Sequence, residues 1–247
     1  MKMFSFAGAF FAFAIIQGCV HNDFSSAPSI TASKPEPVTC DATTLPGNIC
    51  VISVEALRPS QFALGMRDVA GKRKKISKVK NSPERLANYL FTNAVPAVKG
   101  PGGLFYLTDG HHRSRALLEE SVGKVYLRVT KDKSMATPTA FWNEMQAEKL
   151  IWLYDEHGQG PRRTEELPAS LRDLPDDPYR SLAEDAMDTG CYKKTDTPFQ
   201  QFMWANYFRP KIAQDVLIRD WQLALKLACD FSHHHAAKDL PGYFPNR

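Results

Sequence analysis

Five consecutive residues, Asp109, Gly110, His111, His112 and Arg113, combine side chains suited to phosphate chemistry. The guanidinium can hold two phosphate or carboxylate oxygens with its planar fork. Two neutral imidazoles can bind a metal or transfer a proton near neutral pH, although neighbours on a helix point about 100° apart and therefore act separately. The carboxylate can hold a divalent cation or act as a base. The pattern predicts a catalytic site whose groups are the one carboxylate, the two imidazoles and the guanidinium.

The residues on either side predict a strand that turns directly into a helix. Residues 104–107 form an apolar β-like run, and a helical pattern begins at His111 and continues through Leu118. The first N–H groups of such a helix lack intrahelical partners, and the helix dipole is positive there. Both effects favour a bound anion, typically phosphate. In the structural alternative, Asp109 is a plain N-cap and the two histidines make structural hydrogen bonds.

A strongly basic segment lies upstream of this turn. Residues 67–85 contain eight Lys or Arg and two acidic residues, so their net charge of 8 − 2 = +6 exceeds the +4 of the whole chain. Residues 71–80 are predicted to form a loop. In the functional interpretation this loop closes over an anionic ligand or nucleic acid through Lys72 and Lys74. In the alternative it is solvated, or is attracted to anionic lipid or envelope polymer.

The N-terminal residues predict export. Residues 1–19 read as a secretory signal: the apolar stretch 4–16 is too short for a stable membrane anchor, and residues 16–19 (Ile-Gln-Gly-Cys) resemble a bacterial lipobox. Cys19 would then carry lipid, and Val20 after it favours the outer membrane, facing the periplasm. Residues 20–47 are predicted to be a flexible tether. The alternative to lipidation is an ordinary cleaved signal or an apolar start.

Export changes what the cysteines are expected to do. With Cys19 lipidated, four cysteines remain in an oxidising compartment, which allows three pairings. We predict disulfides between Cys40 and Cys50 and between Cys191 and Cys229, because each pair lies within one region of the chain. Buried free thiols are the alternative.

The order of the elements predicts the α/β (α+β) class. Residues 48–135 are expected to form a small α/β domain with a helical part, residues 136–247, packed on it. Strands are expected over residues 49–57, 94–98, 104–108 and 124–130, and helices over 82–91 and 111–123. Further helices are expected over residues 141–158, 178–189, 199–208 and 212–231.

The motif also carries a family resemblance. Residues 110–116 (Gly-His-His-Arg-Ser-Arg-Ala) resemble the nucleotide-binding Gly-Glu-Arg-Arg-x-Arg-Ala motif of the ParB family and the Gly-Cys-His-Arg turn of sulfiredoxin. Residues 177–183 and 240–243 resemble the branch known as ParB-like nucleases, so that the likeness covers about residues 48–245. The resemblance implies the ParB/sulfiredoxin-like fold and a phosphate-binding turn.

The same resemblance suggests individual roles. It makes Gly110, Arg113 and Arg115 phosphate-binding residues, and it aligns Gln61 with a glutamine that follows the first strand in ParB-type domains. His111 occupies the place of the ParB glutamate and of the reactive sulfiredoxin cysteine. That difference disfavours both ParB-type nucleotide hydrolysis and sulfinic acid reduction.

The sequence thus predicts an exported lipoprotein with a phosphate- or nucleotide-binding domain and nuclease-type phosphoester hydrolase activity at residues 109–113. The expected ligand is a nucleotide, a nucleic acid or a sugar phosphate, and the only cofactor considered is a divalent metal, whose ligands are unknown. One alternative is a non-catalytic envelope module that binds a phosphorylated ligand or nucleic acid. Another, if the signal is misread, is a cytoplasmic DNA-binding partition-type protein. Oligomeric state is not predicted.

Overall fold

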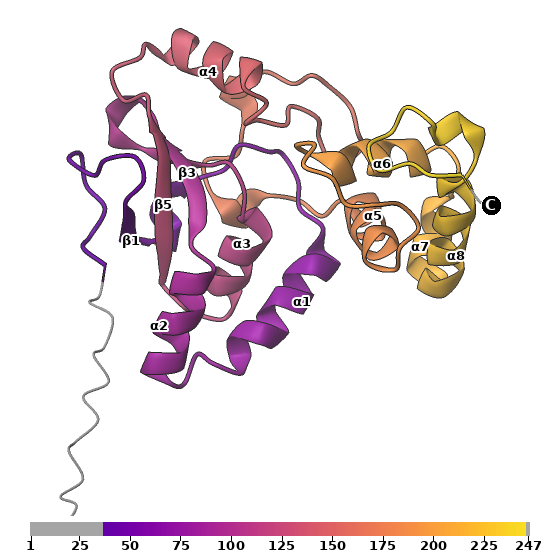
Figure 1. Cartoon of the computed structure of the whole chain (residues 1–247), viewed down its shortest axis with the longest axis horizontal. Helices are drawn as coiled ribbons and strands as arrows, with labels where there is room; N and C mark the ends of the chain where they lie inside the picture. The colour runs from indigo at the N-terminus through magenta and orange to yellow at the C-terminus, as the bar shows by residue number, and fades with distance from the viewer. Residues whose placement is uncertain (1–36, 246–247) are drawn as a thin grey trace, which may run out of the picture. The chain divides into compact units, whose positions relative to one another are not determined.

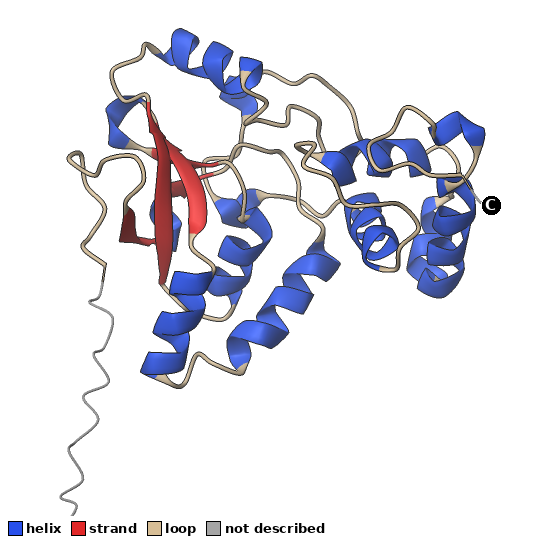
Figure 2. Cartoon of the chain, in the orientation of Figure 1, coloured by secondary structure: helices blue, strands red, loops and turns tan. Residues whose placement is uncertain are grey.

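Residues 37–245 are described by the structure, a computed structural model, and they belong to one compact unit. Within them, five strands form one sheet of order β1-β5-β3-β4-β2 (Figure 2). The strands are β1 (Ile49–Ser53), β2 (Leu57–Arg58), β3 (Val95–Lys99), β4 (Phe105–Leu107) and β5 (Lys124–Asp132). The predicted β3–β4 hairpin is antiparallel, whereas the central pair β3–β5 is parallel. The α/β class is confirmed.

The helices fall into two groups along the chain (Figure 1). The first group packs on the sheet and comprises α1 (Met66–Ser77), α2 (Pro83–Thr92) and α3 (His111–Glu119). The later helices are α4 (Pro138–Ala147), α5 (Pro178–Asp188), α6 (Gln200–Phe208), α7 (Gln214–Arg219) and α8 (Trp221–Ser232). Short 3-10 helices lie at Val54–Ala56, Pro101–Gly103, Thr164–Glu166, Leu171–Asp173 and His235–Ala237.

Three helices begin with the same local device. A short polar side chain at the N-cap accepts a backbone N–H, and proline, which has no N–H to satisfy, fills the first helical position. The caps are Ser82 for α2, Thr137 for α4 and Asp177 for α5. Asp177 is buried and accepts the N–H groups of Tyr179 and Arg180. The predicted starts of α2 and α5 are therefore correct.

Most of the basic loop predicted over residues 71–80 is helix: residues 71–77 belong to α1, and residues 78–80 form a turn. Val69 and Ile76, seven residues apart, are fully buried on one face of α1, which packs beside α3. Lys74 and Lys75 are exposed on α1. The loop interpretation fails because burial of two aliphatic side chains stabilises a helix that is otherwise rich in charged residues and contains Gly71.

Three predicted helices end or break early. α3, predicted to reach Gly123, ends at Glu119. α4 stops at Ala147, because the chain turns at Lys149 with φ +55°, and Ile151 and Leu153 are buried in an extended segment. The helix predicted over residues 212–231 is interrupted at Asp220, whose backbone is non-helical and whose carboxylate caps α8 by accepting the N–H of Leu223 at 3.0 Å. A capping side chain thus starts a new helix within one amphipathic pattern.

Hydrophobic side chains form separate clusters around the sheet and among the late helices. Leu90, Leu117 and Leu127 belong to the sheet cluster, whereas Trp204 and Phe208 belong to the cluster of α5 to α8. The aromatic residues of the late helices are thus core, as expected. In Figure 1, α5 to α8 gather beyond α1. Contacts between α1 and α5 join the helical part to the sheet domain, and both belong to one unit.

Both predicted disulfides are present. Cys40 pairs with Cys50, and Cys191 pairs with Cys229 across 38 positions of sequence, which joins the end of α5 to α8. The first pair also shows that ordered structure begins before residue 48. Cys40 N–H donates to the Val51 carbonyl, and Thr44 is buried. The tether prediction therefore does not hold for residues 38–47.

The predictions for the N-terminus lie outside the described residues. These are the signal sequence, the lipid on Cys19 and the tether up to residue 36. Within residues 37–245, no helix combines the length and the apolar character needed to traverse a bilayer.

Candidate functional site

The chain reverses between β4 and α3 at the predicted turn. Gly110 is the N-cap of α3 and has φ +83°, a left-handed conformation that favours glycine. Asp109 is one residue too early to cap the helix; its Oδ1 accepts the N–H of Gly110 at 2.6 Å instead. No side chain in the described part of the chain caps α3. The backbone N–H groups of its first turn therefore have no intrahelical partner.

The two histidines anchor a buried loop to this turn. The Nε2 atom of His111 accepts the backbone N–H of Ser60 at 3.1 Å, and that of His112 accepts the N–H of Gly65 at 3.0 Å. Residues 59–65 are buried, so each backbone donor needs such a partner. Because Nε2 accepts in both rings, a neutral ring carries its proton on Nδ1. His112 Nδ1 lies 3.7 Å from Asp68 Oδ2.

Burial keeps both imidazoles neutral. It lowers the pKa of His111 to about 4, a shift that the nearby Asp109 charge only partly offsets. Burial also lowers the pKa of His112 well below its usual range, and the charge of Arg180 acts in the same direction. Neither ring can therefore hold a second proton near neutral pH. The Nε2 atoms of both histidines therefore make structural hydrogen bonds, as the structural alternative expects. Their Nδ1 atoms carry the proton and can donate a hydrogen bond.

The two predicted arginines are tied to backbone carbonyls. Arg113 Nη1 donates to the Asn93 carbonyl at 2.9 Å, which places this guanidinium at the C-terminal end of α2. Arg115 donates through Nη1 to the carbonyls of Leu171 and Arg172, and through Nε to Glu119. Arg115 does not line the cavity at the turn, whereas Arg113 does. These contacts hold α3 against its neighbours.

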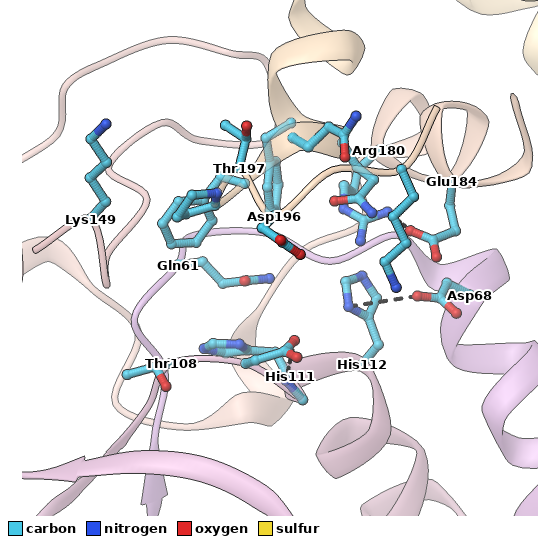
Figure 3. A pocket seen from close by; sticks show the side chains of 18 of the residues that line it. Gln61, Asp68, Thr108, His111, His112, Lys149, Arg180, Glu184, Asp196 and Thr197 are labelled. Atoms are coloured by element: carbon cyan, nitrogen blue, oxygen red, sulfur yellow. Dashed lines mark hydrogen bonds and ion pairs between the residues drawn. The ribbon is translucent and has the colours of Figure 1, made fainter. Parts of the chain in front are cut away.

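A cavity of about 500 Å³ opens over the N-terminus of α3 (Figure 3). Its walls come from the turn after β4, from α1, from the start of α5 and from residues 194–202. Its charged side chains include both signs. The cationic lining residues are Lys72, Lys149, Arg180 and Lys194, besides Arg113, and the acidic ones are Asp68, Asp109, Glu184 and Asp196. The site therefore joins the sheet domain to the helical part.

The structure brings most, but not all, of the predicted ligand-binding residues to this cavity. Gln61 lines it, is buried, and donates through Nε2 to the Ala63 carbonyl at 2.6 Å. Lys72 lines it and pairs with Asp68 at 3.2 Å. Lys74 is exposed on α1 and is not a lining residue.

Sequence reasoning missed the cavity residues contributed by the helical part. The most buried of the missed ions is Arg180, whose Nη1 donates to Glu184 Oε2 at 2.9 Å. The one available signal was the resemblance of residues 177–183 to the ParB-like nuclease branch. Among the described residues, no three His, Cys, Asp or Glu side chains group in a way that could hold a metal.

Substituting Gly110 tests the turn. We expect Gly110→Ala to lower the free energy of unfolding by about 2 kcal/mol, because alanine disfavours the left-handed backbone and its Cβ would lie 2.5 Å from Val95 Cγ1. Gly123→Ala is the matched control: its Cβ meets no atom within 4 Å, and the change should be under about 0.5 kcal/mol. Urea unfolding measures both. Equal stabilities would contradict the strained turn.

The fold and the site define an α/β protein whose uncapped helix N-terminus opens into a charged cavity. A family model described as "Putative ParB-like nuclease" matches residues 50–210. The chain belongs to this family. The resemblance noted at residues 110–116 is thereby confirmed at the level of the family.

A solved structure has a similar fold. The crystal structure of protein Atu1540 from Agrobacterium tumefaciens is 33% identical to this chain, covers 81% of it and 100% of its own chain, and gives a TM-score of 0.73. No curated protein matches the chain. The family and fold therefore rest on the family model and on this structural neighbour.

Proposed function

We propose that the cavity binds a phosphate-bearing ligand at the N-terminus of α3. The observation that carries this proposal is the uncapped first turn of α3, with its free N–H groups, beside a cavity lined by Lys72, Arg180 and Lys194. Backbone donors and the positive end of the helix dipole favour an anion, and lysine and arginine are the usual side-chain partners of phosphate.

Phosphoester cleavage is the second candidate function. It is favoured by Asp109 and Asp196, whose carboxylates line the same cavity and are exposed. A carboxylate can accept a proton from an attacking water, or share a divalent cation with phosphate oxygens. The buried histidines are less suited to be the base, because their Nε2 atoms already accept backbone N–H groups. In this mechanism Asp109 is the base, and His111 and His112 hold the turn.

The cell compartment remains part of the proposal. Two disulfides support a location outside the cytoplasm, in agreement with the predicted signal and with lipid attachment at Cys19. Nucleoside triphosphates are scarce there, so nucleic acid and phosphorylated sugars are better candidate ligands. If no turnover accompanies binding, the protein is an envelope binding module. A reduced protein without lipid in its native cell would support the cytoplasmic alternative.

A binding and turnover experiment tests both functions. The purified protein is melted with nucleotides, nucleic acids or sugar phosphates, each with and without Mg²⁺, and the same samples are assayed for released product. A ligand at about 100 times its Kd should stabilise the fold by about 2.7 kcal/mol. Added salt should weaken the binding, because the ligand is an anion.

The substitution Asp109→Asn separates the two functions. If the protein is a hydrolase, this variant should bind the ligand but lose at least about 100-fold in turnover, since it lacks the base. Product formation unchanged from the wild type would remove Asp109 from the mechanism. If none of the ligand classes shifts the melting temperature, the proposed binding function is wrong.

A further inference from the structure

Arg180 is a buried cation with unused hydrogen-bonding capacity at the cavity. Its side chain is 8% exposed, and it lines the cavity beside His112 (Figure 3). The Nη1 atom donates to Glu184, but the buried Nε atom has no hydrogen-bond partner in the described part of the chain. A buried polar group without a partner is unfavourable, so this guanidinium would be stabilised by a ligand oxygen that reaches it.

The surroundings of Arg180 hold it in place. Its backbone N–H donates to the Asp177 carboxylate at the start of α5, and its guanidinium lies 5.4 Å from the centroid of the Phe202 ring. His112, its neighbour in the cavity, is a neutral ring and cannot neutralise it. A rigid, desolvated guanidinium loses little entropy on binding an oxyanion, and its electrostatic attraction is screened less than that of a surface lysine.

The arginine expected from the sequence is less able to do this. Arg113 also has a buried Nε atom without a hydrogen-bond partner among the described residues, but its side chain is only half-buried, and its Nη1 is held by the Asn93 carbonyl. The other cations of the lining are Lys72, which pairs with Asp68, and the more exposed Lys149 and Lys194. Arg180 is therefore the buried guanidinium that the cavity offers to an anion.

Glu184 forms an ion pair with this guanidinium. Its Oε2 lies 2.9 Å from Arg180 Nη1, one helical turn along α5, and its side chain is 19% exposed. Both residues line the same cavity, so an anion that reaches Arg180 also meets this carboxylate. Like charges repel strongly at such a desolvated position. An arriving oxyanion must therefore displace the carboxylate or bind beside it at a cost.

We infer that Arg180 is the guanidinium that binds the ligand's anionic group, and that Glu184 competes with the ligand for it. This inference rests on the proposed binding function and adds a specificity-determining pair to it. The pair selects ligands whose oxyanion, such as a phosphate, can use the Nε side of the guanidinium. Glu184 thus weakens the binding of anions that make no other contact in the cavity.

Binding of inorganic pyrophosphate to the full-length protein, followed by calorimetry, tests the inference. We expect Arg180→Gln to weaken binding at least 10-fold and Arg180→Lys to restore only part of it, since lysine keeps the charge but lacks the Nε–H. We expect Glu184→Gln to strengthen binding about 3- to 10-fold, because the competing charge is removed. A gain in affinity cannot come from a misfolded protein, so this variant remains informative if Arg180→Gln is unstable.

Two exposed residues outside the cavity provide matched controls. Arg219, on α7, has a side chain that is 81% exposed, and Glu165 is also exposed. Arg219→Gln and Glu165→Gln change the net charge by the same amounts as the test variants, and each should alter the affinity less than twofold. Larger effects from these controls would mean that net charge, rather than the Arg180–Glu184 pair, governs binding, and would overturn the inference.

The outcomes distinguish this inference from the proposed function. If the wild type binds pyrophosphate and Arg180→Gln binds equally well, the Arg180 inference is wrong while the phosphate-binding function stands. If Glu184→Gln leaves the affinity unchanged or weakens it, competition by Glu184 is wrong. If neither the wild type nor Glu184→Gln binds pyrophosphate, the inference and the proposed binding function both fail.

Discussion

Acidification from neutral pH to about pH 4 is expected to reduce the free energy of unfolding by about 3 kcal/mol through His111 alone. Burial lowers the pKa of this ring to about 4, against 6.5 for an exposed histidine. Between those values the unfolded chain binds a proton that the folded protein does not, so stability is lost as the pH falls from 6.5 to 4. The pKa of His112 is lowered as well, which increases the loss.

Urea unfolding at pH 7, 6 and 5 measures this effect before most carboxylates titrate. His111 should by then have contributed about 2 kcal/mol of the loss. Asp132, whose pKa is lowered to about 2 mainly by the Lys99 ammonium, affects stability only at more acidic pH. Glu120 also has a lowered pKa, so it reduces the free energy of unfolding once the pH falls below 4.5, the ordinary pKa of a glutamate. The range from pH 7 to 5 therefore reports the histidines against one opposing group, Asp177, whose pKa is raised by burial.

Two variants identify the source of the pH dependence. His111→Gln keeps an acceptor for the Ser60 N–H but does not titrate, so its stability should fall less steeply with pH than that of the wild type. His157→Gln is the control, because that side chain is 72% exposed. It should retain the slope of the wild type. A His111→Gln variant as acid-sensitive as the wild type would refute the assignment.

Loss of the Cys191–Cys229 disulfide is expected to lower the free energy of unfolding by about 4 kcal/mol. The bond closes a loop of 38 positions that contains α6 and α7, and breaking it gives the unfolded chain more conformational freedom. The Cys40–Cys50 bond closes a loop of 10 positions and should contribute about 3 kcal/mol. Both bonds join residues that are also held by buried packing, because Cys50 and Cys191 are buried.

Paired alanine variants separate the two bonds. Urea unfolding of Cys191→Ala/Cys229→Ala and of Cys40→Ala/Cys50→Ala should show the larger loss for the first. Reduction of the wild type with dithiothreitol should lower the free energy of unfolding by the two losses together. Reduction of each double variant should cause only the loss that belongs to its remaining disulfide. A wild type in which Cys40, Cys50, Cys191 and Cys229 all react with a thiol reagent when denatured without reductant would show that neither bond forms.

Local patterns predicted the elements that hold the site. The Ser82-Pro83 start of α2 and the Asp177-Pro178 start of α5 are correct because capping is a contact between residues two or three positions apart. The strand before Gly110 and the helix after it are correct for a similar reason. The basic helix α1 was missed, since its apolar face consists of little more than Val69 and Ile76.

The roles of the site residues could not be predicted in the same way. The sequence places two histidines at a helix start, but whether Nε2 faces a ligand or a backbone N–H depends on residues about 50 positions away. Ser60 and Gly65 fill those positions here. Arg113 lines the cavity as expected, but the Asn93 carbonyl at the end of α2 holds its Nη1 atom.

The sequence by itself therefore determined the turn at Gly110, the helix that follows it, the cysteine pairing and the family. These depend on short-range contacts, on chain proximity or on a recognisable motif. Only the tertiary structure decided which charged groups meet at that turn. Arg180 and Glu184 reach it from α5, about 70 residues along the chain. Packing between distant segments sets how deeply this pair is buried, and burial lowers the local dielectric constant and so strengthens their electrostatic interactions.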